Sequence, residues 1–278
     1  MTLHKTSNNI LHTSFKELSI QVSLSGLSFC ILDTVENEIE TLDTISFEAQ
    51  SNPESLITHI GNWFEKDQIK DRTFNKIMVI HENELSSFVP KSMFNESNLS
   101  DYLKYNVKIL GNDYINYDEL KSYDLYNVYV PFTNINNYLF EKFGSFEYKH
   151  FSSVLVETLI NASKIGDKHT IYVYIAQKHF EIIVLYQKKL VLYNTFQYQE
   201  KEDFIYYLLF TIEQLHLNPE ETPTYLLGDV TEDSELFEIA YKYIRHLEIG
   251  DSYYPKKFDK KVTNLINSSK TLVLLNSF

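Results

Sequence analysis

The order of secondary structure that the sequence predicts occurs twice along the chain. The first copy is three strands, an amphipathic helix and a buried strand, over 18–24, 28–32, 39–47, 53–65 and 76–80. The second copy repeats this order over 170–175, 180–185, 190–194, 201–215 and 224–227. A unit of three strands, a helix and a strand that is used twice predicts two similar lobes facing each other across a cleft.

Composition and charge narrow the possible partners. Hydrophobic residues make up 44% of the 278 residues, which is enough for a large core. The formal net charge of -13 would repel a phosphate backbone, so we expect no nucleic-acid partner. A small lysine patch, interrupted by Asp259, is interpreted as a solvated surface; it comprises Lys256, Lys257, Lys260 and Lys261.

The single cysteine and the apolar runs bear on the compartment. Cys30 lies among apolar residues and favours a small buried side chain, because one thiol can build neither a disulfide framework nor a thiolate metal cluster. The first sixteen residues are polar and mixed, with no apolar signal core. The longest apolar run, 204–212, is too short to span a bilayer. These observations predict a cytoplasmic protein without a membrane span.

The pattern along the chain predicts a loose lead-in over 1–16, a first lobe over 17–150 and a second lobe over 151–278. A helix over 151–163 bridges the lobes, and the apolar tail 271–275 must pack against one of them. Between 84 and 149 the pattern is mixed. It suggests a short helix over 98–105, a longer one over 133–143, and strands over 85–89, 107–110, 114–117, 125–130 and 146–150.

This element order resembles the actin-like ATPase superfamily, which includes actin, the Hsp70 chaperones and sugar kinases. The segment 171–229 is most similar to the second lobe of the pilus-assembly and secretion-scaffold members. The chain is also similar to an uncharacterised bacterial family, domain-of-unknown-function family 3822. The resemblance implies an α/β fold with two lobes of the actin-like, ribonuclease H-like type. Each lobe would be a mixed sheet that opens with a three-stranded meander and is flanked by helices.

Active members of that superfamily carry an Asp-x-Gly motif at the first hairpin of each lobe. The acid handles the metal, and the glycine lets backbone N–H groups approach phosphate oxygens. In the first hairpin Ser23 stands in place of the acid and Ser25 in place of the glycine, directly before Gly26. In the second hairpin Tyr174 replaces the acid and Ala176 replaces the glycine. The metal therefore lacks obvious ligands.

The rest of the implied nucleotide cleft is equally incomplete. A Gly-Gly turn that accepts adenosine in the superfamily is matched only at Gly228, which precedes Asp229. The seven glycines are too scattered to form a phosphate loop. We expect bulky side chains, Tyr174 and Phe180, to fill the cleft. The residues of this vestigial cleft are Ser23, Ser25, Gly26, Tyr174, Gln177, Lys178, Gly228 and Asp229.

Three hypotheses follow from these residues. The first is a non-catalytic, pseudo-ATPase scaffold or adaptor that binds an unknown protein partner, with no catalytic residues, no metal and no cofactor. The second is a protein that binds ATP with magnesium weakly, with little or no hydrolysis, through Ser23, Ser25, Gln177, Lys178 and Gly228. The third is an enzyme of unrelated chemistry, which would need an acid pair or a metal site that the sequence does not reveal. The sequence leaves the oligomeric state open and favours a non-enzyme.

Overall fold

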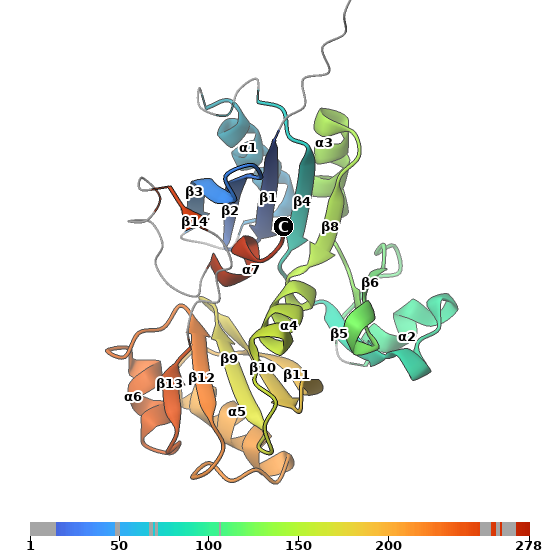
Figure 1. Ribbon diagram of the computed structural model, residues 1–278. Helices are drawn as coiled ribbons and strands as arrows, with labels where there is room; N and C mark the ends of the chain where they lie inside the picture. The colour runs from blue at the N-terminus through green and yellow to red at the C-terminus, as the bar shows by residue number, and fades with distance from the viewer. Residues whose placement is uncertain are drawn as a thin grey trace, which may run out of the picture.

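The computed structural model describes residues 15–47, 51–66, 69, 72–105, 107–250, 257–259, 262 and 271–278. It contains two large sheets stacked one above the other, each covered by helices on its outer face (Figure 1). A third, small sheet projects to one side of the boundary between them. Most of the predicted lead-in lies outside the described residues, as do Lys256, Lys260 and Lys261 of the lysine patch.

The two large sheets repeat one strand order, as the sequence predicts. The first sheet runs β14-β3-β2-β1-β4-β8, with β1 Lys16–Ser23, β2 Gly26–Asp33, β3 Glu38–Ser46, β4 Lys76–His81, β8 Glu147–His150 and β14 Lys257–Phe258. The second runs β11-β10-β9-β12-β13, with β9 Thr170–Ile175, β10 His179–Tyr186, β11 Lys189–Gln197, β12 Thr224–Gly228 and β13 Leu247–Ile249. In both, an antiparallel meander is followed by two parallel strands.

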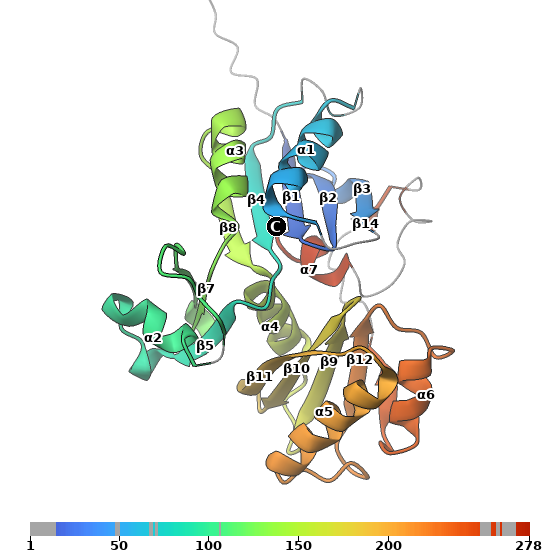
Figure 2. The same cartoon turned by 180° about the vertical axis from the view of Figure 1, so that it is seen from behind.

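The outer helices pack on the sheets through residues that the sequence pattern identifies. The first sheet is covered by α1 (Pro53–Phe64) and α3 (Thr133–Phe143), and the second by α5 (Lys201–Gln214) and α6 (Glu235–Tyr241) (Figure 2). The side chain of Asn52 caps α1 by accepting a hydrogen bond from the N–H of Ser55. Trp63 of α1 stacks on Phe29 with ring centroids 4.0 Å apart, so it belongs to the core.

The small sheet is formed by the segment whose pattern is mixed. It runs β5-β7-β6, with β5 Ser86–Pro90, β6 Asn116–Leu120 and β7 Leu125–Tyr129. Helix α2 (Leu99–Leu103) packs on it beside three short 3-10 helices at Lys91–Met93, Glu96–Asn98 and Lys121–Tyr123. The strand expected at 107–110 does not form. A turn takes its place, because the Asp113 carboxylate accepts the Leu110 N–H at 2.7 Å.

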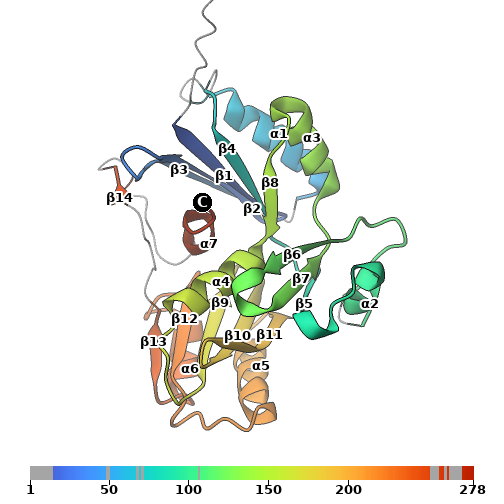
Figure 3. The ribbon, with the colours of Figure 1, turned by 45° about the vertical axis from the view of Figure 1, so that its right-hand side comes forward.

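Two helices fill the layer between the lobes, α4 (Phe151–Ala162) and α7 (Leu272–Leu275) (Figure 3). All four residues of α7 are buried, so the apolar tail packs as expected. The sequence analysis groups this tail with the second lobe, but α7 contacts β1 and β2 of the first sheet. Strand β14 likewise pairs with β3. The end of the described chain therefore returns to the first lobe and holds the two lobes together.

Candidate functional site

The first hairpin closes on itself through its serines. The Oγ atoms of Ser23 and Ser25 lie 3.0 Å apart, and the Ser23 Oγ also lies 3.2 Å from the Gly26 carbonyl oxygen. A Cβ on Gly26 would stand 2.6 Å from the Ile45 carbonyl oxygen. The glycine therefore serves the close approach of β2 to β3. The serine hydroxyls satisfy each other, as a compact turn requires.

The second hairpin buries one of its two bulky residues between the lobes and the other inside the second lobe. Tyr174 is 4% exposed and packs edge-on against Phe151 of α4, with ring centroids 5.0 Å apart. Phe180 packs on Phe204 of α5. The expectation that both fill the cleft is wrong for Phe180. Phe180 pairs with Ile175 and Tyr174 with Glu181, so pleating sends the two aromatic rings to opposite faces of the sheet.

The structure brings Gly228 and Asp229 against the second hairpin. Gly228 has φ of +88°, and a Cβ there would stand 2.1 Å from the Ile175 carbonyl oxygen. The Asp229 N–H donates to the same oxygen at 2.7 Å. Gln177 and Lys178 are exposed at the hairpin tip, where the Lys178 carbonyl accepts the Tyr198 N–H. Beside the hairpin stands a backbone turn that only glycine can make.

A group of charged side chains that the sequence analysis missed lies on the inner face between the hairpins. Gln21 of β1 donates to the Glu82 carboxylate at 2.8 Å, and Glu82 follows directly after β4. On the second lobe, the Nε2 of His179 lies 3.3 Å from the Glu181 carboxylate, which is 2% exposed. A signal for Glu181 exists in the sequence, because it is a lone acid inside an otherwise apolar strand.

The charges in this group are unbalanced. Burial opposes protonation of His179, but Glu181, Glu82 and Glu84 together raise its pKa to about 9. Burial raises the pKa of Glu82, although the nearby His179 works in the opposite direction. Acidic side chains therefore outnumber the imidazole in this group, and all three of them favour its protonated form.

The family comparison covers most of the chain. A family model described as "Protein of unknown function (DUF3822)" matches residues 5–247. The chain belongs to the DUF3822 family. No curated protein matches it.

Solved structures assign this DUF3822 chain to the actin-like ATPase fold. It is similar to a Bacteroides thetaiotaomicron protein of unknown function with that fold, at 20% identity and a TM-score of 0.78, over 94% of this chain and 95% of the other. It is also similar to a chain of the PilM–PilN type IV pilus biogenesis complex, at 11% identity and a TM-score of 0.61, over 94% of this chain and 97% of the other. The fold class predicted from the repeated element order is confirmed.

A second polar cluster of the DUF3822 chain joins the small sheet to α4. The Asp118 carboxylate accepts hydrogen bonds from the Tyr129 hydroxyl, the His150 N–H and the Ser153 hydroxyl. Asn127 donates to the hydroxyls of Ser152 and Ser153 at 2.8 Å each. Burial raises the pKa of Asp118 to about 6 and lowers that of His150 to about 3. These hydrogen bonds connect β6 and β7 of the small sheet to the start of α4.

Two further findings bear on metals and membranes. Within the residues that the structure describes, no three His, Cys, Asp or Glu side chains converge as metal ligands would. Nor does any described helix combine the length and the apolar content needed to cross a bilayer.

Proposed function

We propose that this protein is a non-catalytic, actin-like scaffold or adaptor of the bacterial cytoplasm that acts through contacts with another protein. The observation that carries the proposal is the charge between the hairpins. An actin-like ATPase needs this position to accept a magnesium-bound triphosphate. Here the Glu181 carboxylate lies 3.3 Å from His179, and Glu82 interacts electrostatically with both residues. Buried carboxylates beside phosphate groups would cost several kcal/mol in repulsion.

The residues at the hairpin tips do not fit magnesium and ATP either. The Ser23 hydroxyl oxygen lies 3.0 Å from that of Ser25 and accepts the Ser25 N–H at 3.3 Å, so this N–H is occupied, and neither side chain has a carboxylate for magnesium. Tyr174, at the position of the second acid, is committed to the core between the lobes. Transfer of a phosphoryl group depends on a metal that offsets the developing charge, and these side chains supply no ligand for it. We therefore assign no step of catalysis to this cleft.

Likeness to the PilM–PilN complex supports the choice of a scaffold over other non-catalytic roles. That structure is a complex, so the fold can hold a protein partner. The alternative, a protein that grips ATP without turnover, draws support from Gly228. Its positive φ and its contact with Ile175 keep a tight glycine turn beside the second hairpin. One experiment separates the two functions.

Isothermal titration calorimetry of the full chain with ATP and excess magnesium is that experiment. We expect no saturable heat up to about 1 mM nucleotide, and no phosphate release in a parallel hydrolysis assay. A catalytically active actin-like ATPase serves as the positive control. A saturable isotherm that Ser25→Glu abolishes, and that the control Ser100→Glu on the exposed face of α2 leaves intact, would replace the scaffold with the nucleotide-binding alternative.

A further inference from the structure

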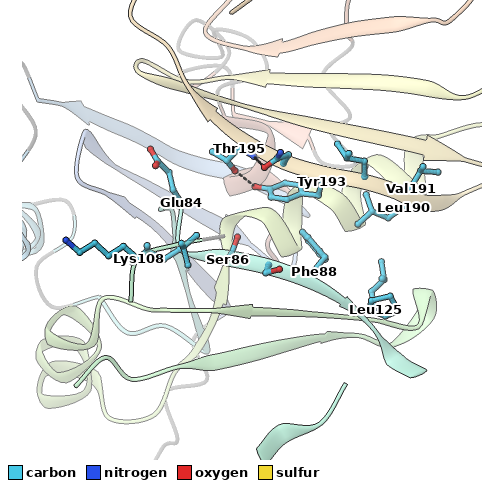
Figure 4. Close-up of a pocket in the computed structure, with 15 residues that line it drawn as sticks. Glu84, Ser86, Phe88, Lys108, Leu125, Leu190, Val191, Tyr193 and Thr195 are labelled. Atoms are coloured by element: carbon cyan, nitrogen blue, oxygen red, sulfur yellow. Dashed lines mark hydrogen bonds between the residues drawn. The ribbon is translucent and has the colours of Figure 1, made fainter. Parts of the chain in front are cut away.

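A groove of about 680 Å³ runs between the small sheet and the second lobe. Strand β5 is the edge of the small sheet and β11 is the edge of the second large sheet. Both strands line the groove, and Figure 4 shows their side chains converging across it. Among the described residues, no strand pairs with the outer edge of β11. A free strand edge offers backbone N–H and C=O groups that an extended peptide can pair with.

The floor of this groove is apolar. The rings of Phe88 from β5 and Tyr193 from β11 meet edge-on with centroids 5.0 Å apart, which closes the groove from below (Figure 4). Leu125 and Leu190 continue the floor toward one end, and all four side chains pack against the core between the lobes. Alternate side chains of an extended peptide would rest on such a surface.

The other end of the groove is acidic. Along β11 the inner face passes from Tyr193 to Thr195, which is paired with Glu181, and to Gln197, which is paired with His179. Gln197 donates to both oxygens of Glu84, a residue that lines the groove. The groove thus leads from aromatic rings to the group of carboxylates between the hairpins. Lys108 also lines the groove, but its amine points away from Tyr193 (Figure 4).

Two buried acceptors in the group of charged side chains between the hairpins have no hydrogen-bond donor. The Oε2 of Glu181 and the Oε1 of Gln21 make no hydrogen bond, although their residues are only 2% and 8% exposed. A buried acceptor without a donor destabilises the structure, and more so if it is charged. A group that carries both positive charge and several N–H donors would satisfy both atoms and neutralise the surplus carboxylates. Arginine has five such donors in a rigid fork, and lysine has three.

We propose that the groove between β5 and β11 binds an extended peptide segment of the partner protein, whose arginine or lysine side chain enters the cluster of Glu82, Glu84 and Glu181. This inference rests on the proposed scaffold function and names the chemistry of its partner. The charge of the protein and of the groove determines which class of peptide can bind. The net charge of -13 and the acidic end of the groove disfavour acidic peptides and nucleic acids. The apolar floor gives the neighbouring residues of the peptide a surface to cover.

Selection from a phage library of random nonapeptides, with the full chain as bait, provides the probe. We expect enriched peptides to share one arginine or lysine beside alternating apolar residues. The best peptide is then synthesised with arginine and with citrulline, which has nearly the same shape but no charge. We expect fluorescence anisotropy to show citrulline binding at least about tenfold more weakly. Glu82→Gln with Glu181→Gln should reduce the affinity for the arginine peptide by a similar factor and leave the citrulline peptide unchanged.

The location is tested by photocrosslinking from single positions. A benzoylphenylalanine at Val191, which is 45% exposed in β11, should crosslink to the peptide. The same group at Glu248 in β13, on the far edge of the same sheet, should not. No enrichment, enrichment of acidic or uncharged peptides, or crosslinking from Glu248 instead of Val191 would each overturn the proposal. So would dimers of the chain that disappear in Val191→Asp, because a second copy would then occupy the groove.

The outcome of the peptide-binding experiments is independent of the outcome of the ATP calorimetry. If ATP binds, the scaffold proposal fails whatever the peptides do. If neither ATP nor any basic peptide binds, the scaffold function stands and only the assignment of its partner to this groove is lost.

Discussion

The hydroxyl oxygens of Ser19 and Ser277 lie 2.6 Å apart, although 258 positions separate the two residues in the chain. Ser277 also donates to the Leu274 carbonyl at 2.7 Å. A hydroxyl has one proton, so Ser19 must be the donor to Ser277. This relay ties the end of α7 to the inner face of β1. It shows that the described C-terminal segment is part of the first lobe's structure and supports the layer between the lobes.

The first prediction concerns α7. Leu274 is fully buried between the lobes, so Leu274→Ala should lower the free energy of unfolding by about 2–5 kcal/mol through lost burial and the cavity left behind. Urea denaturation followed by circular dichroism measures this loss. Ile165→Ala, at a position 78% exposed, is the matched control and should change stability by less than about 0.5 kcal/mol. Equal effects of the two variants would mean that α7 does not hold the lobes together.

A second prediction concerns the tight turn at Gly228. Alanine there would have an unfavourable φ, and its Cβ would collide with backbone atoms of Ile175. We expect Gly228→Ala to destabilise the protein by about 3 kcal/mol or more, or to prevent folding. Gly111 has open space around it and no positive φ, so Gly111→Ala is the control. Thermal unfolding of both variants measures this effect. A melting temperature of Gly228→Ala equal to that of the unaltered chain would contradict the turn geometry.

Local patterns were sufficient to predict much of the fold. The helix expected over 133–143 and the strand over 170–175 form at those residues, because apolar periodicity and nearby caps specify them locally. The repeat predicted three strands, a helix and a further strand in each lobe, and both lobes contain them. The attachment of the apolar tail could not be predicted, because either lobe offers an apolar face to residues 272–275. The turn at 111–112, which follows the segment where a strand was expected, was also missed, because the apolar residues before it outweighed the Asp113 side chain that closes it.

The candidate site was harder to predict than the fold. Motif comparison directs attention to the hairpin tips, where Ser23 and Tyr174 replace acids. The acids of this site, Glu82 and Glu181, lie at other positions and belong to different lobes, so only the packing of the two lobes brings them near each other. Glu181 is opposite Tyr174 across β9 and β10, a relationship that requires the register of the hairpin. Even the error on Phe180 is one of register, since a shift of one residue changes the face.

The third prediction is a loss of stability at alkaline pH that depends on His179. Its folded pKa of about 9 lies above the ordinary value of 6.5 because of the surrounding carboxylates. The stabilisation from the charged imidazole is therefore complete below about pH 6.5 and is lost as the pH rises through about 9. We expect a decrease in the free energy of unfolding of about 2–3 kcal/mol from this group.

Chemical denaturation at pH 6.5 and 9.5 tests this contribution of His179 to stability. His179→Gln should remove this part of the pH dependence, and Glu181→Gln should weaken it by removing the nearest carboxylate. His216, which is exposed just after α5, provides a control in His216→Gln. If the pH dependence of His179→Gln equals that of the unaltered chain, the imidazole is not held charged by the cluster.

The last prediction concerns Asp118, where pH acts in the opposite direction from the usual carboxylate. Burial raises its folded pKa to about 6 from the ordinary value of 3.8, despite three donors to the carboxylate. Between these values the folded state holds a proton that the unfolded state has lost. This group therefore stabilises the fold most below about pH 4, and its contribution falls away as the pH rises through 6.

Asp118→Asn lacks this titration. The free energy of unfolding of the unaltered chain minus that of Asp118→Asn should consequently be about 2 kcal/mol larger at pH 4.5 than at pH 7. Because both chains keep His81 and His150, whose lowered pKa values destabilise the fold in acid, that effect cancels in the difference. A difference that stays constant with pH would show that Asp118 titrates normally and that its carboxylate is solvated in the folded protein.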